Sequence, residues 1–219
     1  YGKFTSEFWG PSMSFKWGWI IQEIVSPIIF SIFFLCSGVH DKGIAWIFFI
    51  IWNVHYFNRS IIFPMRQKQT AKCPLAIVLS AVFFNIINGF TNGYFLGYLI
   101  QYDFNYIYSL QFIIGFIVLV FGIIINVKSD NILISIKKKN NDYQIPNGFM
   151  YRYISCPNYF GEIIEWIGFY IMTASDPALV FVFWTMCNLI PRAISNHNWY
   201  INKFSDYPKN RKAVIPFLI

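Results

Sequence analysis

Residues Lys16–Ser37 read KWGWIIQEIVSPIIFSIFFLCS, a nearly unbroken apolar run that contains one carboxylate, Glu23. A helix of about 20 apolar residues crosses a hydrocarbon core of about 30 Å. Five further runs have the same character: Gly43–Met65, Pro74–Ile100, Ile107–Val127, Phe160–Ala174 and Pro177–Ala193. The pattern predicts an all-α integral membrane protein, a bundle of six transmembrane helices in this chain.

The composition supports this class. Hydrophobic residues make up 56% of the chain and charged residues 12%, against about 25% charged in ordinary soluble domains. No internal repeat or low-complexity linker interrupts the sequence, so residues 1–219 are predicted to form a single transmembrane domain. The four cysteines show neither CxxC nor Cys/His spacing, which predicts neither disulfides nor a metal site.

The basic residues indicate how the spans are oriented. If the spans alternate, all but one of the 17 Lys and Arg residues lie on one side of the membrane, and Lys42 is the exception. Positive charge stays on the cytoplasmic side, so both ends of the chain are predicted to be cytoplasmic. The basic residues are not interleaved with an aromatic platform, and no nucleic-acid partner is expected. The group on the predicted cytoplasmic side comprises Lys3, Lys16, Arg59, Arg66, Lys68, Lys72, Lys128, Lys137–Lys139, Arg152, Arg192, Lys203, Lys209, Arg211 and Lys212.

Two polar residues lie inside predicted spans at a similar depth. Glu23 and Tyr56 are each several residues from the cytoplasmic end of a helix, which is roughly 10 Å at a rise of 1.5 Å per residue. Ionisable groups within a membrane are costly and commonly functional. A carboxyl in apolar surroundings is expected to hold its proton at neutral pH. Beside a phenol it would form a proton-donating pair suited to polarising a carbonyl oxygen.

Further polar residues are predicted in the same cytoplasmic half: Asn126, Asp130, Asn158, Glu162, Glu165 and Arg192. Structural roles compete with functional ones here. Glu165 could pair with Arg59 or Arg192, and Asn158 could cap the fifth helix. His55 is more typical of a satisfied core histidine than of a catalyst.

Two stretches resemble the steroid 5-alpha-reductase family: NYFGEIIEWIGF at Asn158–Phe169 and HNWYINKFSDYPKNRKAVIPFLI at His197–Ile219. The opening YGKFTSE and the segments WIIQE and VHYFNRS are similar to its steroid branch. The family fold has seven helices, and the motif YGK follows the first of them. The resemblance therefore implies that this chain lacks that helix and that cytoplasmic loops close a cofactor site.

The resemblance also implies roles for individual residues. Glu23 and Tyr56 would bind the substrate ketone, and the cofactor would be NADPH. Two positions depart from the family pattern, Gln144 for an arginine and Asn196 for a histidine, and both concern the adenosine-phosphate contacts. His197, next to Asn196, is the candidate to take the role of the histidine that Asn196 replaces. The implied cofactor contacts are Lys3, Asn126, Asp130, Tyr143, Asn158, Glu162, Arg192, His197 and Tyr200.

The expected activity is NADPH-dependent reduction of the 4-ene double bond of 3-oxo steroids. Enoyl-CoA or polyprenol reduction within the same family is one alternative. An S-adenosylmethionine-dependent isoprenylcysteine methyltransferase, which shares a similar membrane architecture, is a second, and a transporter is a third. The sequence has no GxGxxG after a strand, which excludes a Rossmann site. The protein is expected to be a monomer in the bacterial inner membrane or the endoplasmic reticulum, with its cofactor site facing the cytoplasm and a lipid bilayer around it.

Overall fold

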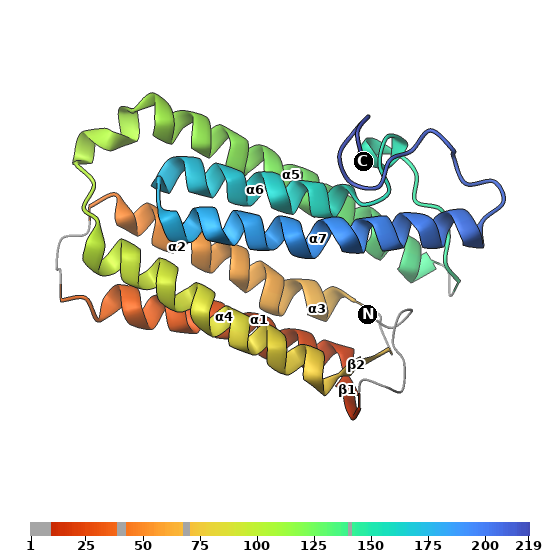
Figure 1. Ribbon diagram of the computed structural model, residues 1–219, viewed down its shortest axis with the longest axis horizontal. Helices are drawn as coiled ribbons and strands as arrows, with labels where there is room; N and C mark the ends of the chain where they lie inside the picture. The colour runs from red at the N-terminus through yellow and green to blue at the C-terminus, as the bar shows by residue number, and fades with distance from the viewer. Residues whose placement is uncertain (1–9, 39–42, 68–70, 140–141) are drawn as a thin grey trace. The chain divides into compact units, whose positions relative to one another are not determined.

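The computed structural model describes residues 10–38, 43–67, 71–139 and 142–219, and these residues are mainly helical (Figure 1). The chain divides into two units, Tyr1–Ile107 and Tyr108–Ile219. Four helical runs in the described part are long and apolar enough to cross a membrane: Phe15–Leu35, Leu75–Leu99, Leu110–Lys139 and Asp176–Lys203. The prediction of a multi-pass helical membrane protein is confirmed.

The two remaining predicted spans are also helical. The predicted span Gly43–Met65 corresponds to α2 (Ala45–Phe57), a π-helical turn η2 (Asn58–Ile62) and α3 (Phe63–Arg66), which follow one another without a break. The predicted fifth span corresponds to α6 (Pro157–Thr173). The number of membrane crossings stays a prediction.

In the first unit, a short antiparallel ribbon sets the direction of two helices. Strand β1 (Ser12–Ser14) pairs with β2 (Lys72–Pro74), with Met13 opposite Cys73. Helix α1 (Phe15–Leu35) follows β1, and α4 (Leu75–Tyr94) follows β2. Both helices therefore start at the same ribbon and run side by side in the same direction (Figure 1).

Glycines on α4 let its backbone approach that of α1 closely. A Cβ atom at Gly89 would lie 2.7 Å from the Ser26 carbonyl oxygen, and one at Gly93 would lie 2.5 Å from that of Phe30. Spacing of small residues by four is a common device for packing membrane helices. The series continues at Gly97 in η3, the π-helical end of the run (Phe95–Leu99). These contacts align α4 with α1 residue by residue along the parallel pair.

Helix α2 packs against α1 in the opposite direction. Near the start of α1, the Trp19 indole N–H donates to the Arg59 carbonyl oxygen at 2.9 Å. Further along, the Phe30 and Trp52 rings stack with centroids 4.7 Å apart. Residue numbers therefore rise along α1 while the numbers of the neighbouring residues on α2 and η2 fall. Glu23 lies between the two contacts on α1, at the level of Tyr56.

The second unit contains a tightly packed antiparallel helix pair. It follows a 3-10 turn, η4 (Phe104–Tyr108), and consists of α5 (Leu110–Lys139) and α6. A Cβ atom at Gly122 would lie 2.3 Å from the Glu165 nitrogen, and one at Gly161 would lie 2.4 Å from the Asn126 nitrogen. Only glycine allows the two backbones to come this close. Gly115 and Gly168 provide the same fit two turns away from these positions.

Gly122→Ala should destabilise this pair strongly. The added methyl group would have to displace α6 backbone, and overpacking of this kind costs about 1–3 kcal/mol or more. Thermal unfolding of the purified protein in detergent should show a clear fall in Tm. Ser135→Ala, an exposed position on the same helix, should leave Tm nearly unchanged, and equal Tm values for the two variants would contradict this view of the α5–α6 contact.

The C-terminal segment completes the second unit. Helix α7 (Asp176–Lys203) begins after Ser175, whose hydroxyl accepts from the Ala178 N–H at 3.3 Å. Beyond α7 the chain returns to the residues before α6, where the Ser155 and Cys156 N–H groups donate to the Lys212 and Ala213 carbonyl oxygens at 2.8 and 3.0 Å. Val214 is fully buried. Ala213 and Val214 are therefore part of the core of the second unit.

Two predicted helix ends were wrong. The fourth span was predicted to end at Val127, but α5 continues to Lys139. The sixth was predicted to end at Ala193, but α7 continues to Lys203. Hydropathy indicates where the apolar stretch ends, whereas helical hydrogen bonding continues through polar sequence. The three lysines in the last turn of α5 also complement the negative end of the helix dipole.

Candidate functional site

The predicted ketone-binding residues both lie in the first unit. Tyr56 on α2 is 3% exposed, and Glu23 on α1 is half-buried at the same level. One Glu23 carboxylate oxygen, Oε1, accepts from the Gln22 side-chain amide at 2.9 Å. The phenol and the carboxyl thus lie at one level of α1 and α2, and their joint role in binding a ketone stays a prediction.

The backbone around Tyr56 is unusual. The π-helical turn η2 begins two residues later, at Asn58, and the Ser60 hydroxyl donates to the Tyr56 carbonyl oxygen at 2.6 Å. π turns inside α-helices are frequent at functional sites because they change the direction of neighbouring side chains. The Trp52 ring, 5.2 Å from the Tyr56 ring, packs against it one turn earlier. The Ser60 hydrogen bond therefore fixes the Tyr56 backbone, and packing against Trp52 fixes its ring.

Sequence reasoning missed a row of buried amides on α4. Asn85, Asn88 and Asn92 are 5%, 4% and 1% exposed. The Asn88 amide donates to the Tyr56 phenol oxygen at 3.3 Å. Their spacing of three and four residues places them on one helix face, and that spacing within an apolar span was the signal available in the sequence.

The second unit joins three of the residues assigned to the cofactor. The Asn126 amide on α5 donates to the Asn158 carbonyl oxygen at 2.9 Å. The Asn158 amide on α6 donates to the Asp130 carboxylate at 3.0 Å. Asn126 and Asp130 are one turn apart on α5, and the close approach at Gly161 brings them to the start of α6. Glu162 follows Asn158 by one turn and is half-buried.

Tyr151 lies beside this cluster, in the turn η5 (Phe149–Arg152). Its hydroxyl donates to the Ser129 carbonyl oxygen at 3.3 Å. Burial, with the negative charge of Asp130 nearby, raises the pKa of the Tyr151 phenol well above its ordinary value. The phenol therefore stays protonated and keeps its hydrogen bond to α5. Amides and carboxylates together supply the donors and acceptors that a carboxamide ring such as nicotinamide requires.

The other predicted cofactor residues of this unit lie on or beside α7. The Tyr143 ring packs edge-on against Trp199 at 4.8 Å, and Tyr200 stacks on Tyr207 at 5.4 Å. His197 Nδ1 lies 2.6 Å from the Ser155 hydroxyl, which also contacts the Tyr207 hydroxyl at 2.6 Å. His197 therefore joins α7 to the chain before α6 and to the C-terminal segment. Arg192 is half-buried on the same helix.

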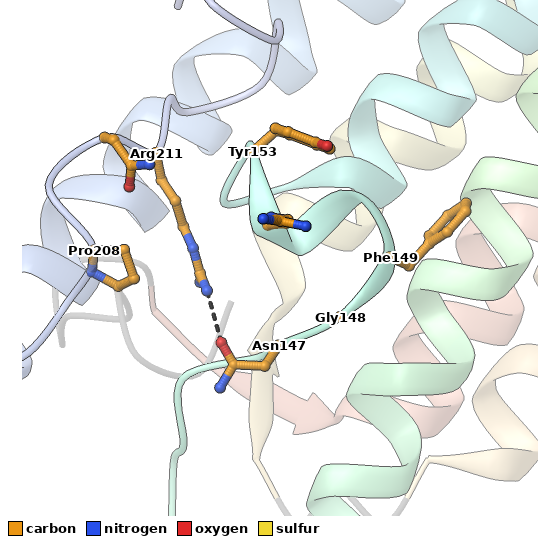
Figure 2. A pocket seen from close by; sticks show the side chains of 8 residues that line it. Asn147, Gly148, Phe149, Tyr153, Pro208 and Arg211 are labelled. Carbon is orange, nitrogen blue, oxygen red and sulfur yellow. Dashed lines mark hydrogen bonds between the residues drawn. The ribbon is translucent and has the colours of Figure 1, made fainter.

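A basic pocket of about 510 Å³ lies between the loop before η5 and the C-terminal segment (Figure 2). Arg211, 4% exposed, donates from its guanidinium to the Pro146 carbonyl oxygen at 3.0 Å and to the Asn147 side-chain oxygen at 2.8 Å. Figure 2 shows this side chain extended toward Asn147. Arg211, missed in the sequence, thus anchors the loop to the C-terminal segment.

Roles were also predicted for Lys3, Arg59 and Glu165. Lys3 lies outside the described residues. The Arg59 guanidinium lies over the rings of Trp19 and Phe63, at 5.0 and 4.9 Å from their centroids. Glu165 is 3% exposed on α6, and its pairing with an arginine stays a prediction.

These features define a multi-pass helical membrane protein with buried polar residues in the described part of each unit. A family model described as 3-oxo-5-alpha-steroid 4-dehydrogenase matches residues 71–219. Over the whole chain and 87% of each relative, the protein is 36% identical to steroid 5-alpha-reductase DET2 of Solanum lycopersicum and 32% identical to 3-oxo-5-alpha-steroid 4-dehydrogenase 1 of Mus musculus. The Homo sapiens 3-oxo-5-alpha-steroid 4-dehydrogenase 1 is 36% identical over 91% of this chain and 78% of its own length.

The chain belongs to the 3-oxo-5-alpha-steroid 4-dehydrogenase family. It is therefore an oxidoreductase of the membrane.

Proposed function

We propose that this protein uses NADPH to reduce the 4-ene double bond of a 3-oxo steroid, or of a similar flat and apolar enone, to the 5-alpha product. The relatives carry the names of steroid 5-alpha-reductases, which supports a steroid as substrate. The observation that carries the proposal is Tyr56, a buried phenol that lies at the level of Glu23 in a mainly apolar set of helices. An apolar substrate with one ketone oxygen matches such surroundings.

The Tyr56 phenol, supported by the Glu23 carboxyl, would donate a hydrogen bond to the substrate ketone. This withdraws electron density from the conjugated double bond and makes its β-carbon electrophilic. NADPH, when bound, supplies the hydride for that carbon. Negative charge then grows on the ketone oxygen, and donors aimed at it in a dry site stabilise the transition state. The α-carbon takes its proton from solvent or a nearby acid.

The second unit supplies all but one of the residues that we assign to the cofactor, the exception being Lys3. Asn158 and Glu162 would hold the nicotinamide end, since an amide and a carboxylate together offer it a donor and an acceptor. The cluster of Asn126, Asp130 and Asn158 fits this role because the Asn126 amide holds the Asn158 backbone and Asp130 orients the Asn158 side chain. The remaining assigned contacts are Lys3, Tyr143, Arg192, His197 and Tyr200.

The family match argues against the alternatives from other classes, the methyltransferase and the transporter. Within the family, the steroid names of the relatives favour a steroid over an enoyl-CoA or a polyprenol. The charge distribution supports a cofactor site on the cytoplasmic side of the inner membrane or the endoplasmic reticulum.

The direct test is to incubate the purified protein with NADPH and testosterone or progesterone and to analyse the steroids by mass spectrometry. We expect the 5-alpha product, with NADPH used more efficiently than NADH. S-Adenosylmethionine should not stabilise the protein against heat. Thermal stabilisation by S-adenosylmethionine, with no turnover of any enone, would contradict the proposal.

Glu23→Gln should lower the rate by about tenfold or more, which corresponds to ~1.4 kcal/mol of activation free energy. Glutamine keeps the shape of the side chain and a hydrogen-bond donor but loses the acidity, so the effect reports on the proton and not on packing. Steady-state kinetics would be measured on a variant whose Tm matches the wild type. Wild-type turnover in that variant would remove Glu23 from the ketone site.

A further inference from the structure

The buried asparagines of α4 have no part in the mechanism described so far. An amide inside an apolar helix bundle is costly unless it is hydrogen-bonded. Asn92 donates to Asn88, and Asn88 in turn donates to the Tyr56 phenol oxygen. Asn85, one turn earlier, instead donates to the Gln22 carbonyl oxygen on α1 at 2.6 Å. The row therefore contains one amide that joins α4 to α1, one that contacts the phenol, and one that bonds to the amide at the phenol.

The hydrogen bonds determine which way the Asn88 amide faces. Asn92 Nδ2 lies 3.1 Å from the Asn88 backbone oxygen, which can only accept, so this atom must be the nitrogen. The same nitrogen donates to Asn88 Oδ1 at 3.0 Å. Asn88 Oδ1 is thus assigned as the oxygen, and the Asn88 nitrogen must face the Tyr56 phenol oxygen.

This orientation constrains the phenol proton. An amide N–H donates and cannot accept, so at this contact the Tyr56 oxygen is the acceptor. The proton of the phenol must then point away from Asn88. A hydrogen bond received by a hydroxyl oxygen also polarises its O–H group and strengthens it as a donor.

We propose that Asn88, oriented by Asn92, is a positioning residue that directs the Tyr56 O–H toward the substrate ketone. This inference rests on the role proposed above for Tyr56. Asn88 itself does not touch the reacting atoms. Its contribution is to fix the direction of the phenol proton.

Asn88→Leu removes the amide while keeping a side chain of similar shape, and Asn85→Leu is the matched control on the same helix face. The main readout is the infrared stretching band of the ketone in a bound 3-oxo-4-ene steroid, isotope-labelled at the ketone carbon. A stronger hydrogen bond to the oxygen lowers this frequency. Tyr56→Phe gives the reference position of the band without the phenol.

In Asn88→Leu we expect the band to move toward its position in Tyr56→Phe and kcat to fall by about tenfold, with KM nearly unchanged. Asn85→Leu should lower Tm without moving the band. If Asn88→Leu does not fold, Asn92→Leu provides the same test, because it removes the donor that orients Asn88.

Two negative outcomes are distinguishable. A wild-type band and kcat in the Asn88 or Asn92 variant, with the band shifted in Tyr56→Phe, would overturn the positioning role and leave the role of Tyr56 intact. A band that does not move even in Tyr56→Phe would overturn the proposed function of Tyr56, and the inference with it.

Discussion

Replacing Tyr56 with phenylalanine is expected to lower kcat for enone reduction by about 10²–10³-fold, the usual effect of removing one donor to a developing oxyanion. The hydroxyl is the only group lost. The ring keeps its packing against Trp52, 5.2 Å away, and the π-helical turn after Tyr56 depends on backbone hydrogen bonds. Single-turnover measurement of steroid reduction with saturating NADPH would report the chemical step directly.

Cofactor binding should be unaffected in the same variant, because Tyr56 has no assigned contact with NADPH and the residues assigned to it, apart from Lys3, belong to the second unit. Tyr102→Phe is the matched control, since Tyr102 lies in the same unit, packs on Phe48 at 5.1 Å and has no assigned role in the reaction. It should retain normal turnover. A loss of NADPH affinity in Tyr56→Phe as large as the loss of activity would show that Tyr56 contributes to cofactor binding.

The second large effect is expected for Glu162→Ala. Binding to the native state alone stabilises a protein by about 2.7 kcal/mol when the ligand is at 100 times its Kd. Glu162 lies one turn after Asn158 on α6, and Asn158 is already bonded to Asp130. If Glu162 grips the nicotinamide end, the rise in Tm caused by NADPH should shrink strongly or vanish in the variant.

A purely structural role for Glu162 leads to a different result. The variant would then lose stability equally with and without NADPH, and the NADPH-induced rise in Tm would keep its wild-type size. Asp176→Ala also removes one negative charge, but at the start of α7, at the other end of α6 from Asn158. This variant should retain the full NADPH-induced rise in Tm. An unchanged rise in Glu162→Ala would remove Glu162 from the cofactor site.

Much of the candidate site could be predicted because its residues are locally conspicuous. Glu23 and Tyr56 stand out in apolar helices, and a depth estimate from the helical rise places them together. Asn126 and Asp130 share one face of α5 through their spacing. Arg211 was missed because an arginine in a basic C-terminal segment resembles any solvated cation. Its burial depends on the loop at Pro146–Asn147, which is far from it in the sequence.

The sequence by itself determined the class of the protein, the approximate extent of its helices and the polar residues within them. These properties follow from hydropathy and spacing, which are local. Which of these polar groups meet depends instead on contacts between residues far apart in the sequence. Gly89 and Gly93 align α4 with α1, and Gly122 and Gly161 allow α5 and α6 backbones to touch. Hydrogen bonds between helices require the helices to be aligned within a fraction of a turn. The glycine contacts help to set that alignment, and with it the pairing of Asn88 with Tyr56 and of Asn158 with Asp130.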